Sequence, residues 1–505
     1  MVLKCINKYN KLYIENILTQ NKEQNLINKQ KYSQYYTSPN IAIYMAYFFK
    51  KPNKKEIRIL EPGAGEGVLI IAFILRLLQD NDRKVKKIFI TLYEIDMKLI
   101  VSLKNNMDTI VEYAKVYGLE IIYEIKNKNF ILKFNEEKVK FNYIITNPPY
   151  MKLSNDSEDN KKLLDIGINV PNYYAAFITL SKRLLLENGE IVAITPRSFC
   201  NGRYYLWFRK DLISDMTFDK IHLFESRKDV FKEDDILQEN IIYHCIKKKF
   251  KKRKKVKIMY TYNNTLENAS VVERNIEDVI YPNDSKSMIR ILKDNQDEEI
   301  NQKMNCLNCD LKKLNIEVST GPIVDFREDD NVLTKKYENK CVPIIFCEHI
   351  SKNGLNWPRN DVKKYNYIKK NEKNRKNLRK NGNFVILKRM TSKEEQRRII
   401  SCVWEETEYK FEEVTFDNKV NYFHRNKSGL PILLAKGLSI YLNSSIVDVY
   451  FRTFSGNTQV NVTDLRSIKY PNKNILENLG SKYELVHDSQ ELIDGIVEEI
   501  VFNNN

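Results

Sequence analysis

The chain has 505 residues and a formal net charge of +17, from 83 lysines and arginines against 66 aspartates and glutamates. Such a length exceeds what one hydrophobic core supports, so we expect two or three domains. Glycine (15) and proline (13) are scarce, which excludes collagen-like and low-complexity chains, and the longest apolar stretches, 41–49 and 68–78, are too short to span a bilayer.

The N-terminus carries charged and polar residues where a signal peptide would have its apolar core, so we expect a cytoplasmic protein with no membrane partner. Residues 1–30 are expected to form a helical segment. The next feature, Tyr36-Thr37-Ser38-Pro39, places a capping residue and a proline ahead of a helix over 41–49.

From residue 57, short apolar runs alternate with amphipathic segments, the pattern of strand–helix–strand units. We expect an α/β domain with a doubly wound, seven-stranded sheet over residues 31–246. Because no strong helix separates the last two strands, the seventh can run antiparallel. The expected strands are Ile57–Leu60, Ile88–Tyr93, Leu119–Ile125, Asn142–Thr146, Glu190–Thr195, Lys220–Phe224 and Asn240–Cys245. Helices are expected at Val68–Leu78, Met97–Tyr117, Asn172–Leu186 and Tyr204–Leu212.

A glycine-rich turn follows the first strand and opens a helix, which lets the backbone approach a ligand closely. It reads Glu61-Pro62-Gly63-Ala64-Gly65-Glu66-Gly67. No Gly-Lys-Ser/Thr follows, and the acidic side chains of Glu61 and Glu66 would repel a pyrophosphate, so this is not a phosphate-binding loop. A cationic ligand is favoured instead, and the sulfonium and amino groups of S-adenosylmethionine meet that requirement.

Two further strand ends carry residues suited to a nucleoside. The second strand ends in Tyr93-Glu94-Ile95-Asp96, where a carboxylate can accept hydrogen bonds from a ribose diol. The third is followed by Asn129-Phe130, an amide and an aromatic ring that could read and sandwich an adenine.

The fourth strand ends in Asn147-Pro148-Pro149-Tyr150, the most informative tetrapeptide in the chain. The exocyclic amine of adenine is a poor nucleophile because its lone pair is delocalised into the ring. An attacking geometry therefore needs acceptors for both amine hydrogens. The Asn147 amide oxygen and the Pro148 carbonyl can supply them, held rigid by consecutive prolines, while Tyr150 offers a ring face to the base.

In this order, these segments resemble the gamma class, or Taq type, of adenine-N6 DNA methyltransferases of restriction–modification systems. The resemblance covers most of the chain. It implies S-adenosylmethionine as cofactor, no metal, double-stranded DNA as substrate and methyl transfer to a flipped adenine. It also assigns Tyr36, Thr37, Pro39 and Asn147 to the cofactor site, together with the glycine turn, Glu94, Ile95, Asn129 and Phe130. One departure is visible, because the family has an aspartate where this chain has Asn129.

The resemblance further implies an aromatic residue after strand five that covers the second face of the flipped base. After Thr195-Pro196-Arg197-Ser198-Phe199, the spacing favours Tyr205, with simple packing as the alternative. Three more stretches resemble adenine methylases of this type. They are Val230-Phe231-Lys232 to Gln238-Glu239-Asn240, Ser319-Thr320-Gly321-Pro322 and Gly456-Asn457-Thr458-Gln459-Val460-Asn461.

Beyond the catalytic domain we expect a basic connecting region over 247–310, a mixed α+β target-recognition domain over 311–473 and a C-terminal helix over 474–505. The apolar stripe of this helix is expected to consist of Leu485, Leu492, Ile493, Ile496 and Ile500. Arginine and lysine can read guanine, and asparagine or glutamine can read adenine, in the major groove. The candidates for reading DNA are Arg327, Lys388, Arg389, Gln459 and Asn461.

Basic residues are concentrated in two runs, with nine over 247–257 and nine over 362–380. Each run is either a phosphate-facing surface or a solvated segment in a lysine-rich chain. Cys306, Cys309, Cys341 and Cys347 have the wrong spacing for a zinc ribbon, so no metal is expected.

Several alternatives stay open. Asn-Pro-Pro-Tyr also occurs in amine methyltransferases that act on RNA or on a protein glutamine, and methylation of cytosine N4 uses a related motif. Cytosine-C5 chemistry is excluded because no Pro-Cys dipeptide occurs. A fused nuclease has little room before Thr37, and an inactive DNA-binding scaffold conflicts with the intact tetrapeptide. We expect a monomer, and whether a separately encoded restriction endonuclease is a partner is open.

Overall fold

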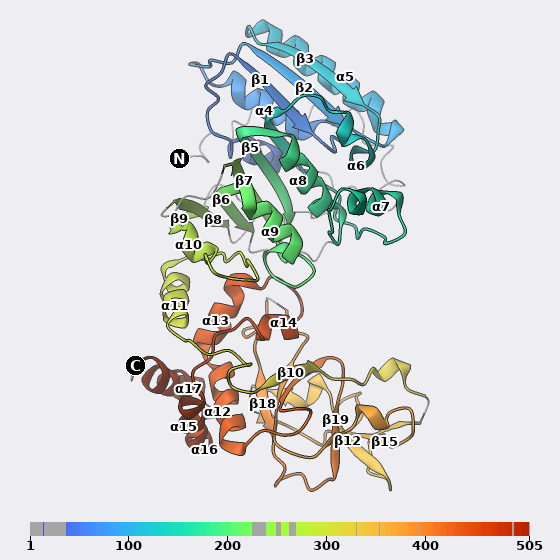
Figure 1. The fold of residues 1–505 in the computed structure, drawn as a ribbon, viewed down its shortest axis with the longest axis vertical. Coiled ribbons are helices and arrows are strands. Elements are labelled where there is room, and N and C mark those ends of the chain that lie inside the picture. The colour runs from blue at the N-terminus through green and yellow to red at the C-terminus, as the bar shows by residue number, and fades with distance from the viewer. Residues whose placement is uncertain are drawn as a thin grey trace. The chain divides into compact units, whose positions relative to one another are not determined.

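The structure is a computed structural model that describes residues 14, 37–224, 239–248, 254–261, 269–329, 331–352, 354–392, 394–486 and 489–503. Tyr36, the expected helical segment over 1–30 apart from Ile14, and residues 230–238 lie outside the described residues. The chain divides into two compact units, Met1–Lys293 and Asp294–Asn505 (Figure 1).

The first unit is built on a nine-stranded sheet in the order β3-β2-β1-β4-β5-β7-β6-β8-β9. All seven expected strands are present, and β7 runs antiparallel to both β5 and β6. The doubly wound fold is therefore confirmed. The strands are β1 (Glu56–Glu61), β2 (Lys87–Tyr93), β3 (Glu120–Lys126), β4 (Phe141–Thr146), β5 (Leu185–Pro196), β6 (Met216–Phe224), β7 (Asn240–Lys247), β8 (Lys255–Thr261) and β9 (Ser270–Asn275).

The sheet continues past residue 246, where we expected the catalytic domain to end. Strand β8 pairs in parallel with β6, and β9 pairs antiparallel with β8. In β8 the exposed Lys255 and Lys257 alternate with the buried Val256 and Ile258. This is the period of a half-buried strand, and the high density of lysines concealed it. The expected connecting region is thus partly sheet.

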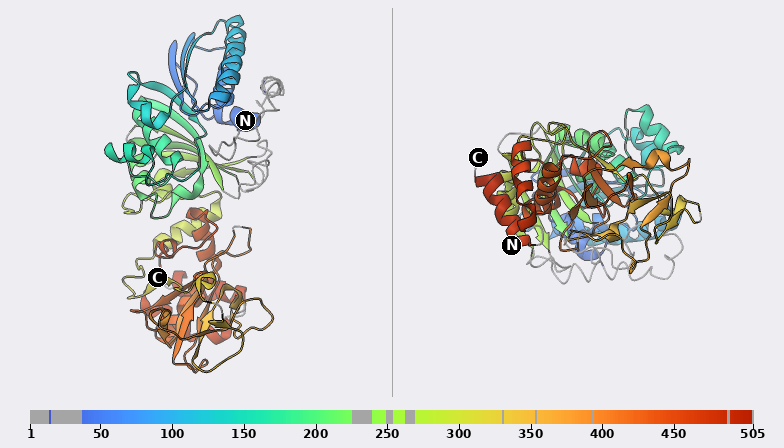
Figure 2. Two further views of the ribbon diagram at one scale, coloured as in Figure 1. Left: turned by 90° about the vertical axis from the view of Figure 1, so that its right-hand side faces the viewer. Right: turned by 90° about the horizontal axis from the view of Figure 1, so that it is seen from below.

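Helices cover both faces of this sheet (Figures 1 and 2). One group packs together as α3, α4 and α5, and the other as α6, α7, α8 and α9. Helix α4 is almost entirely buried, which explains its near-continuous apolar sequence. The helices are α3 (Pro39–Ala46), α4 (Val68–Leu78), α5 (Met97–Val116), α6 (Phe130–Lys133), α7 (Glu158–Asp165), α8 (Tyr173–Leu184), α9 (Leu206–Asp215) and α10 (Ile276–Val279).

The second unit mixes short strands with helices, as expected for 311–473. Its strands form a four-stranded sheet, β10-β20-β17-β18, a five-stranded sheet, β11-β15-β12-β19-β16, and the hairpin β13–β14. Their bounds are β10 (Glu317–Thr320), β11 (Leu333–Thr334), β12 (Cys341–Ile345), β13 (Ile350–Ser351), β14 (Gly354–Leu355), β15 (Tyr367–Lys369), β16 (Arg379–Lys380), β17 (Phe384–Lys388), β18 (Ser401–Trp404), β19 (Glu413–Phe416) and β20 (Val420–His424).

The helices of the second unit gather on one side of its strands (Figures 1 and 2). They are α11 (Asn295–Asn305), α12 (Ile432–Asn443), α13 (Ser445–Phe454), α14 (Val462–Leu465), α15 (Lys473–Ser481), α16 (Tyr483–Val486) and α17 (Gln490–Val497). Within the described residues no single helix is long and apolar enough to cross a membrane. Helices α12 and α13 reach that length only as a pair bent by 62°, and most of their side chains are buried.

The expectation of one helix over 474–505 is wrong. Three helices and a π-helical turn (Glu498–Asn503) lie there instead. Helix α15 ends at Ser481, with Lys482 as its C-cap, and Ser489 caps a new helix by accepting a hydrogen bond from the Leu492 backbone N–H. Leu485 and Leu492, expected in an apolar stripe, are exposed by 70% and 53%.

Helices α12 and α15 cross at two glycines, Gly437 and Gly480. A Cβ atom on Gly437 would lie 1.7 Å from the Leu476 carbonyl oxygen, and one on Gly480 would lie 1.9 Å from the Leu433 carbonyl oxygen. The two backbones are therefore in direct contact, and no larger residue fits at either position.

Candidate active site at the carboxyl edge of the sheet

The glycine turn between β1 and α4 lies against the end of β2. The Ala64 backbone N–H donates to the Tyr93 carbonyl (2.8 Å), which anchors the turn to the neighbouring strand. Gly65 and Gly67 have φ of +55° and +83°, a left-handed conformation that favours glycine. A Cβ on Gly67 would also lie 2.9 Å from the Leu103 side chain. The left-handed conformation thus favours glycine at both positions, and at Gly67 a larger residue would also have to displace the Leu103 side chain.

Glu94 is fixed beside this turn. Its carboxylate accepts hydrogen bonds from the backbone N–H groups of Gly65 (2.7 Å) and Asp96 (2.8 Å), and Asp96 in turn caps α5. Burial raises the pKa of Glu94, while these backbone donors oppose the rise. Ile95, the next residue, is 47% exposed and offers an apolar surface at the same edge.

Glu61 ends β1 and is buried to 1% exposure. Burial raises its pKa well above the usual value, the backbone N–H of Ile70 opposes this, and the nearby Glu94 charge adds to it. Its Oε2 atom has no hydrogen-bond partner among the described residues. A buried carboxyl oxygen without a partner, beside a second carboxylate, fits the ammonium and sulfonium charges of S-adenosylmethionine.

Asn129 is engaged differently from our expectation. Its Oδ1 atom caps α6 by accepting from the backbone N–H groups of Ile131 (2.9 Å) and Leu132 (3.3 Å). Its Nδ2 donates to the Asp159 carboxylate (2.8 Å). The amide oxygen that we expected to face a cofactor adenine thus already accepts two hydrogen bonds.

Phe130 is only 2% exposed. Its ring lies 5.2 Å from that of Tyr93 and 5.3 Å from that of Phe177, which in turn lies next to Gly63. The residue therefore packs in the core behind the turn, and a role in sandwiching adenine remains a prediction.

Asn147 lies at the end of β4, where sequence analysis placed it. Its Nδ2 donates to Thr37 Oγ1 at 3.0 Å, a contact between residues 110 positions apart. Ser38, the residue after Thr37, caps α3 by accepting from the Ile41 backbone N–H. Two segments identified separately in the sequence are therefore in direct contact, and the bond orients the Asn147 amide.

The aromatic residues of the site are held by packing. Tyr150 is 8% exposed and donates to the Ile194 carbonyl at 3.5 Å. Tyr205 stacks on Tyr174 with ring centroids 5.8 Å apart, and its hydroxyl accepts from Asn172 Nδ2 (3.0 Å). Tyr204, in contrast, is 83% exposed. The packing alternative for Tyr205 thus has direct support, and its base-covering role stays a prediction.

A buried ion pair joins two of the stretches noted in the sequence. Arg197 follows β5, and Glu239 precedes β7. Their side chains meet at 3.2 Å with exposures of 5% and 3%, and the Arg197 backbone N–H donates to the Glu239 carbonyl (2.7 Å). The ion pair joins the end of β5 to the start of β7. The segment that leads to Tyr205 begins at this point.

In the second unit, two of the five candidate DNA-reading residues contact each other. The Arg389 guanidinium donates to Gln459 Oε1 (3.0 Å) and to the Asn418 carbonyl (2.8 Å). Asn461 instead caps α14 in a reciprocal arrangement with Asp464. Lys388 is half-buried at the end of β17, and Arg327 is exposed next to Phe326, itself 76% exposed.

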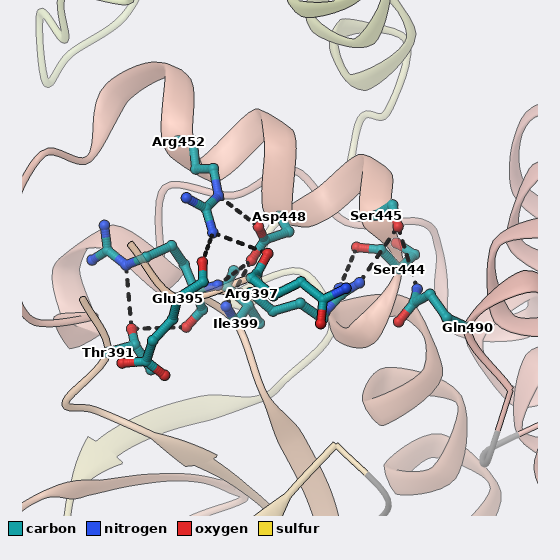
Figure 3. A network of polar contacts seen from close by, with 11 residues as sticks. Thr391, Glu395, Arg397, Ile399, Ser444, Ser445, Asp448, Arg452 and Gln490 are labelled. Carbon is teal, nitrogen blue, oxygen red and sulfur yellow. Dashed lines mark hydrogen bonds and ion pairs between the residues drawn. The ribbon is translucent and has the colours of Figure 1, made fainter. Parts of the chain in front are cut away.

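A network of polar contacts fixes the segments around this pair (Figure 3). Asp448 of α13 accepts from the backbone N–H groups of Arg398 (2.7 Å) and Ile399 (2.8 Å), and from the Arg452 side chain (2.7 Å). The fully buried Arg398 guanidinium donates to the Asn457 carbonyl (2.5 Å). The network thereby ties the stretch that contains Gln459 to helix α13.

The basic run over 362–380 is partly paired with acidic residues. Four of its nine basic side chains form ion pairs, Lys364 with Asp325, Lys369 with Glu338, Lys370 with Glu413 and Lys373 with Asp329. Arg379 is buried and donates to the Tyr422 hydroxyl. Nine minus five leaves four exposed cations, Lys363, Arg375, Lys376 and Lys380.

The chain matches a family model over part of its length and known proteins over most of it. The family model of the Eco57I restriction-modification methylase matches residues 92–231. The type II methyltransferase M.PstI of Providencia stuartii is 36% identical over 480 residues, which cover 93% of each chain. M.BsuBI of Bacillus subtilis is 37% identical over 490 residues, or 95% of this chain and 96% of its own. Among solved structures, the type IIG restriction endonuclease BpuSI has 11% identity and a TM-score of 0.47 over 94% of this chain and 67% of its own.

Proposed function

Because the chain belongs to the type II DNA methyltransferases of restriction–modification systems, we propose that it methylates the N6 amine of an adenine flipped out of duplex DNA. The observation that carries the proposal is the Asn147–Thr37 hydrogen bond at the end of β4. Since Nδ2 donates to Thr37, the other side of the amide is the acceptor Oδ1, the group that an adenine amine requires.

The chain's own residues orient the nucleophile. Asn147 Oδ1 and the Pro148 carbonyl accept the two amine hydrogens, which draws the nitrogen lone pair out of conjugation and toward the methyl donor. With the cofactor bound, the methyl carbon would pass from sulfur to this nitrogen, and the positively charged nitrogen would then release a proton, so no strong general base is needed.

The cofactor site lies at the same edge of the sheet. S-adenosylmethionine, when bound, supplies a methyl group on a sulfonium that leaves as a neutral thioether. The glycine turn, Glu94 with Ile95, and Glu61 would hold it, because they offer backbone N–H groups, carboxylates and an apolar surface within one continuous set of contacts. Pro62 belongs to the glycine turn, and Pro39 is the first residue of α3, directly after Thr37 and Ser38.

The second unit is the proposed target-recognition domain. We assign sequence reading to the region of Arg389 and Gln459, and phosphate contact to the exposed cations. Flipping a base costs a few kcal/mol, which contacts of this kind must offset.

The first test uses Asn147→Ala in the full chain. We expect DNA and cofactor binding to be retained and methyl transfer to fall by about a hundredfold to a thousandfold, because a preorganised acceptor is lost. Methyl transfer is measured with labelled cofactor, and the product is identified by mass spectrometry of nucleosides from the DNA.

The control is Asn142→Ala, an asparagine earlier on β4 that accepts from the Arg58 backbone N–H away from the strand end. It should keep its activity. Unchanged turnover of Asn147→Ala would refute the site. N4-methylcytosine as the product would refute the adenine assignment alone, and the absence of any methylated nucleoside would favour an RNA or protein substrate.

A further inference from the structure

We propose that Asp159 replaces the aspartate that this family has at position 129, and that Asn129 and Asp159 together select adenine as the base of the cofactor. The inference rests on the proposed function, since it concerns the S-adenosylmethionine site. Asp159 has no motif of its own and lies 30 residues beyond Asn129.

Asn129 alone cannot act as the missing aspartate. Its only acceptor atom, Oδ1, already receives the backbone N–H groups of Ile131 and Leu132 at the start of α6. The side chain therefore presents a donor, Nδ2, toward its surroundings. Any acceptor for the exocyclic amine of adenine must come from another residue.

Asp159 is positioned to be that residue. It is 9% exposed, and its two oxygens accept from Asn129 Nδ2 (2.8 Å) and from the Tyr173 hydroxyl (2.7 Å). It lies in the first turn of α7, which Ser157 caps, and a helix N-terminus favours negative charge. Removing a carboxylate from water is costly, and the hydrogen bonds from Asn129 and Tyr173 offset that cost.

The pair also lies next to the proposed nucleoside site. Asn127, two residues before Asn129, donates through Nδ2 to the carbonyl of Glu94 (2.9 Å). On the other side, the Phe130 ring contacts Phe177, which lies against Gly63 of the turn. Helix α6 contacts both α7 and α8, so the two helices at which the pair lies pack together with α8, the helix of Tyr173 (Figure 1).

The pattern of donor and acceptor matches adenine. Nδ2 of Asn129 keeps a second hydrogen, and the Asp159 carboxylate keeps lone pairs. A donor beside an acceptor is the complement of the adenine edge, which has the acceptor N1 beside the donor N6–H. Hypoxanthine has the opposite pattern, with N1–H as donor and O6 as acceptor.

The experiment measures binding and does not depend on turnover. Isothermal titration calorimetry on the full chain compares S-adenosylhomocysteine with S-inosylhomocysteine, which differ only in the base edge. We expect the unchanged chain to prefer the adenosyl compound by about tenfold or more, and Asp159→Asn to reduce that preference to less than about threefold.

An exchange of the two side chains separates this role from a structural one. Asn129→Asp places two carboxylates together and should weaken S-adenosylhomocysteine about tenfold. In the double variant Asn129→Asp/Asp159→Asn, a carboxylate at position 129 can cap α6 and accept from the amide introduced at position 159. The exchange places the acceptor opposite N1 and the donor opposite the exocyclic group, so binding should recover with a reversed preference, for S-inosylhomocysteine over S-adenosylhomocysteine. Glu158→Gln, an exposed carboxylate in the same turn, is the matched control and should change neither quantity.

The outcomes are distinct. An unchanged preference in Asp159→Asn, or no reversal of preference in the exchanged variant, overturns this inference and leaves the proposed function intact. If Asp159→Asn does not fold, the comparison of Asn129→Asp with the exchanged variant decides. Failure of the unchanged chain to bind S-adenosylhomocysteine overturns the proposed function itself.

Discussion

Single side chains decide the chemistry of the site, and Glu61 shows how. The glycine turn and the tetrapeptide could be located in the sequence because their residues follow strand ends, where a parallel sheet collects them. The raised pKa of Glu61 could not be predicted from the sequence, since it depends on complete burial and on the Glu94 charge. Asp159 was missed for a similar reason, because its contact with Asn129 joins two helix starts that carry no shared signature.

We expect Glu61→Gln to stabilise the ligand-free protein and to weaken cofactor binding. A carboxyl whose folded pKa is raised costs no stability below its unfolded pKa of about 4.5, and the cost grows as the pH rises toward the folded value. At pH 7 the variant should melt about 2 °C or more above the unchanged chain. Loss of the negative charge should weaken S-adenosylmethionine about tenfold or more.

Thermal unfolding at pH 5 and pH 8, with and without the cofactor, checks this expectation. The difference in melting temperature between the two chains should be larger at pH 8. A variant that melts lower at both values and binds the cofactor normally would contradict the role assigned to Glu61.

At the scale of elements, hydrophobic periodicity predicted the strands of the central sheet, but it failed at β8 and at the C-terminal helices. All seven strands expected from alternating apolar runs are present, but β8 was hidden by its lysines. The C-terminal stripe of leucines and isoleucines suggested one helix, but α15 ends with a C-cap at Lys482 and Ser489 caps the start of α17. Local capping hydrogen bonds outweighed apolar periodicity there.

The crossing of α12 and α15 gives a prediction for elements. Gly437→Ala and Gly480→Ala should each cost about 3 kcal/mol or more of unfolding free energy, because the added methyl group meets backbone oxygen atoms that cannot move independently. Gly495→Ala, in the interior of α17 with no atom within 4 Å of the added carbon, should be neutral or stabilise by about 0.5–1 kcal/mol.

Denaturant unfolding of the three variants tests this helix crossing. Equal stability of Gly437→Ala and Gly495→Ala would show that the backbones of α12 and α15 are not in contact.

At the scale of the whole molecule, the net charge of +17 overstates what is available to DNA. In the run over 362–380, ion pairs and the burial of Arg379 engage five of nine cations. The sequence showed how dense the run is, but not which acidic residues fold against it, since these come from positions 325 to 413. Of the nine cations in this run, only the remaining four are candidates for contact with DNA phosphates.

Replacing Lys363, Arg375, Lys376 and Lys380 together by alanine should therefore reduce the salt dependence of DNA binding. Four contacts at about 0.9 each would lower the slope of log affinity against log salt by at most about 3.6. Lys369→Ala, whose lysine already pairs with Glu338, is the control and should change the slope little. Binding titrations across a range of salt concentrations measure both. An unchanged slope in the fourfold variant would identify the run as a solvated surface.

The hydrogen bond between Thr37 and Asn147 also has an evolutionary consequence. In the structure the hydroxyl accepts from Nδ2, which is the bond that accompanies the amide orientation with its oxygen directed to a substrate amine. Relatives that lose the hydroxyl at position 37 must then select the orientation by another donor or acceptor. The two positions should consequently vary together among related sequences, as one inherited unit, although 110 positions separate them in the chain.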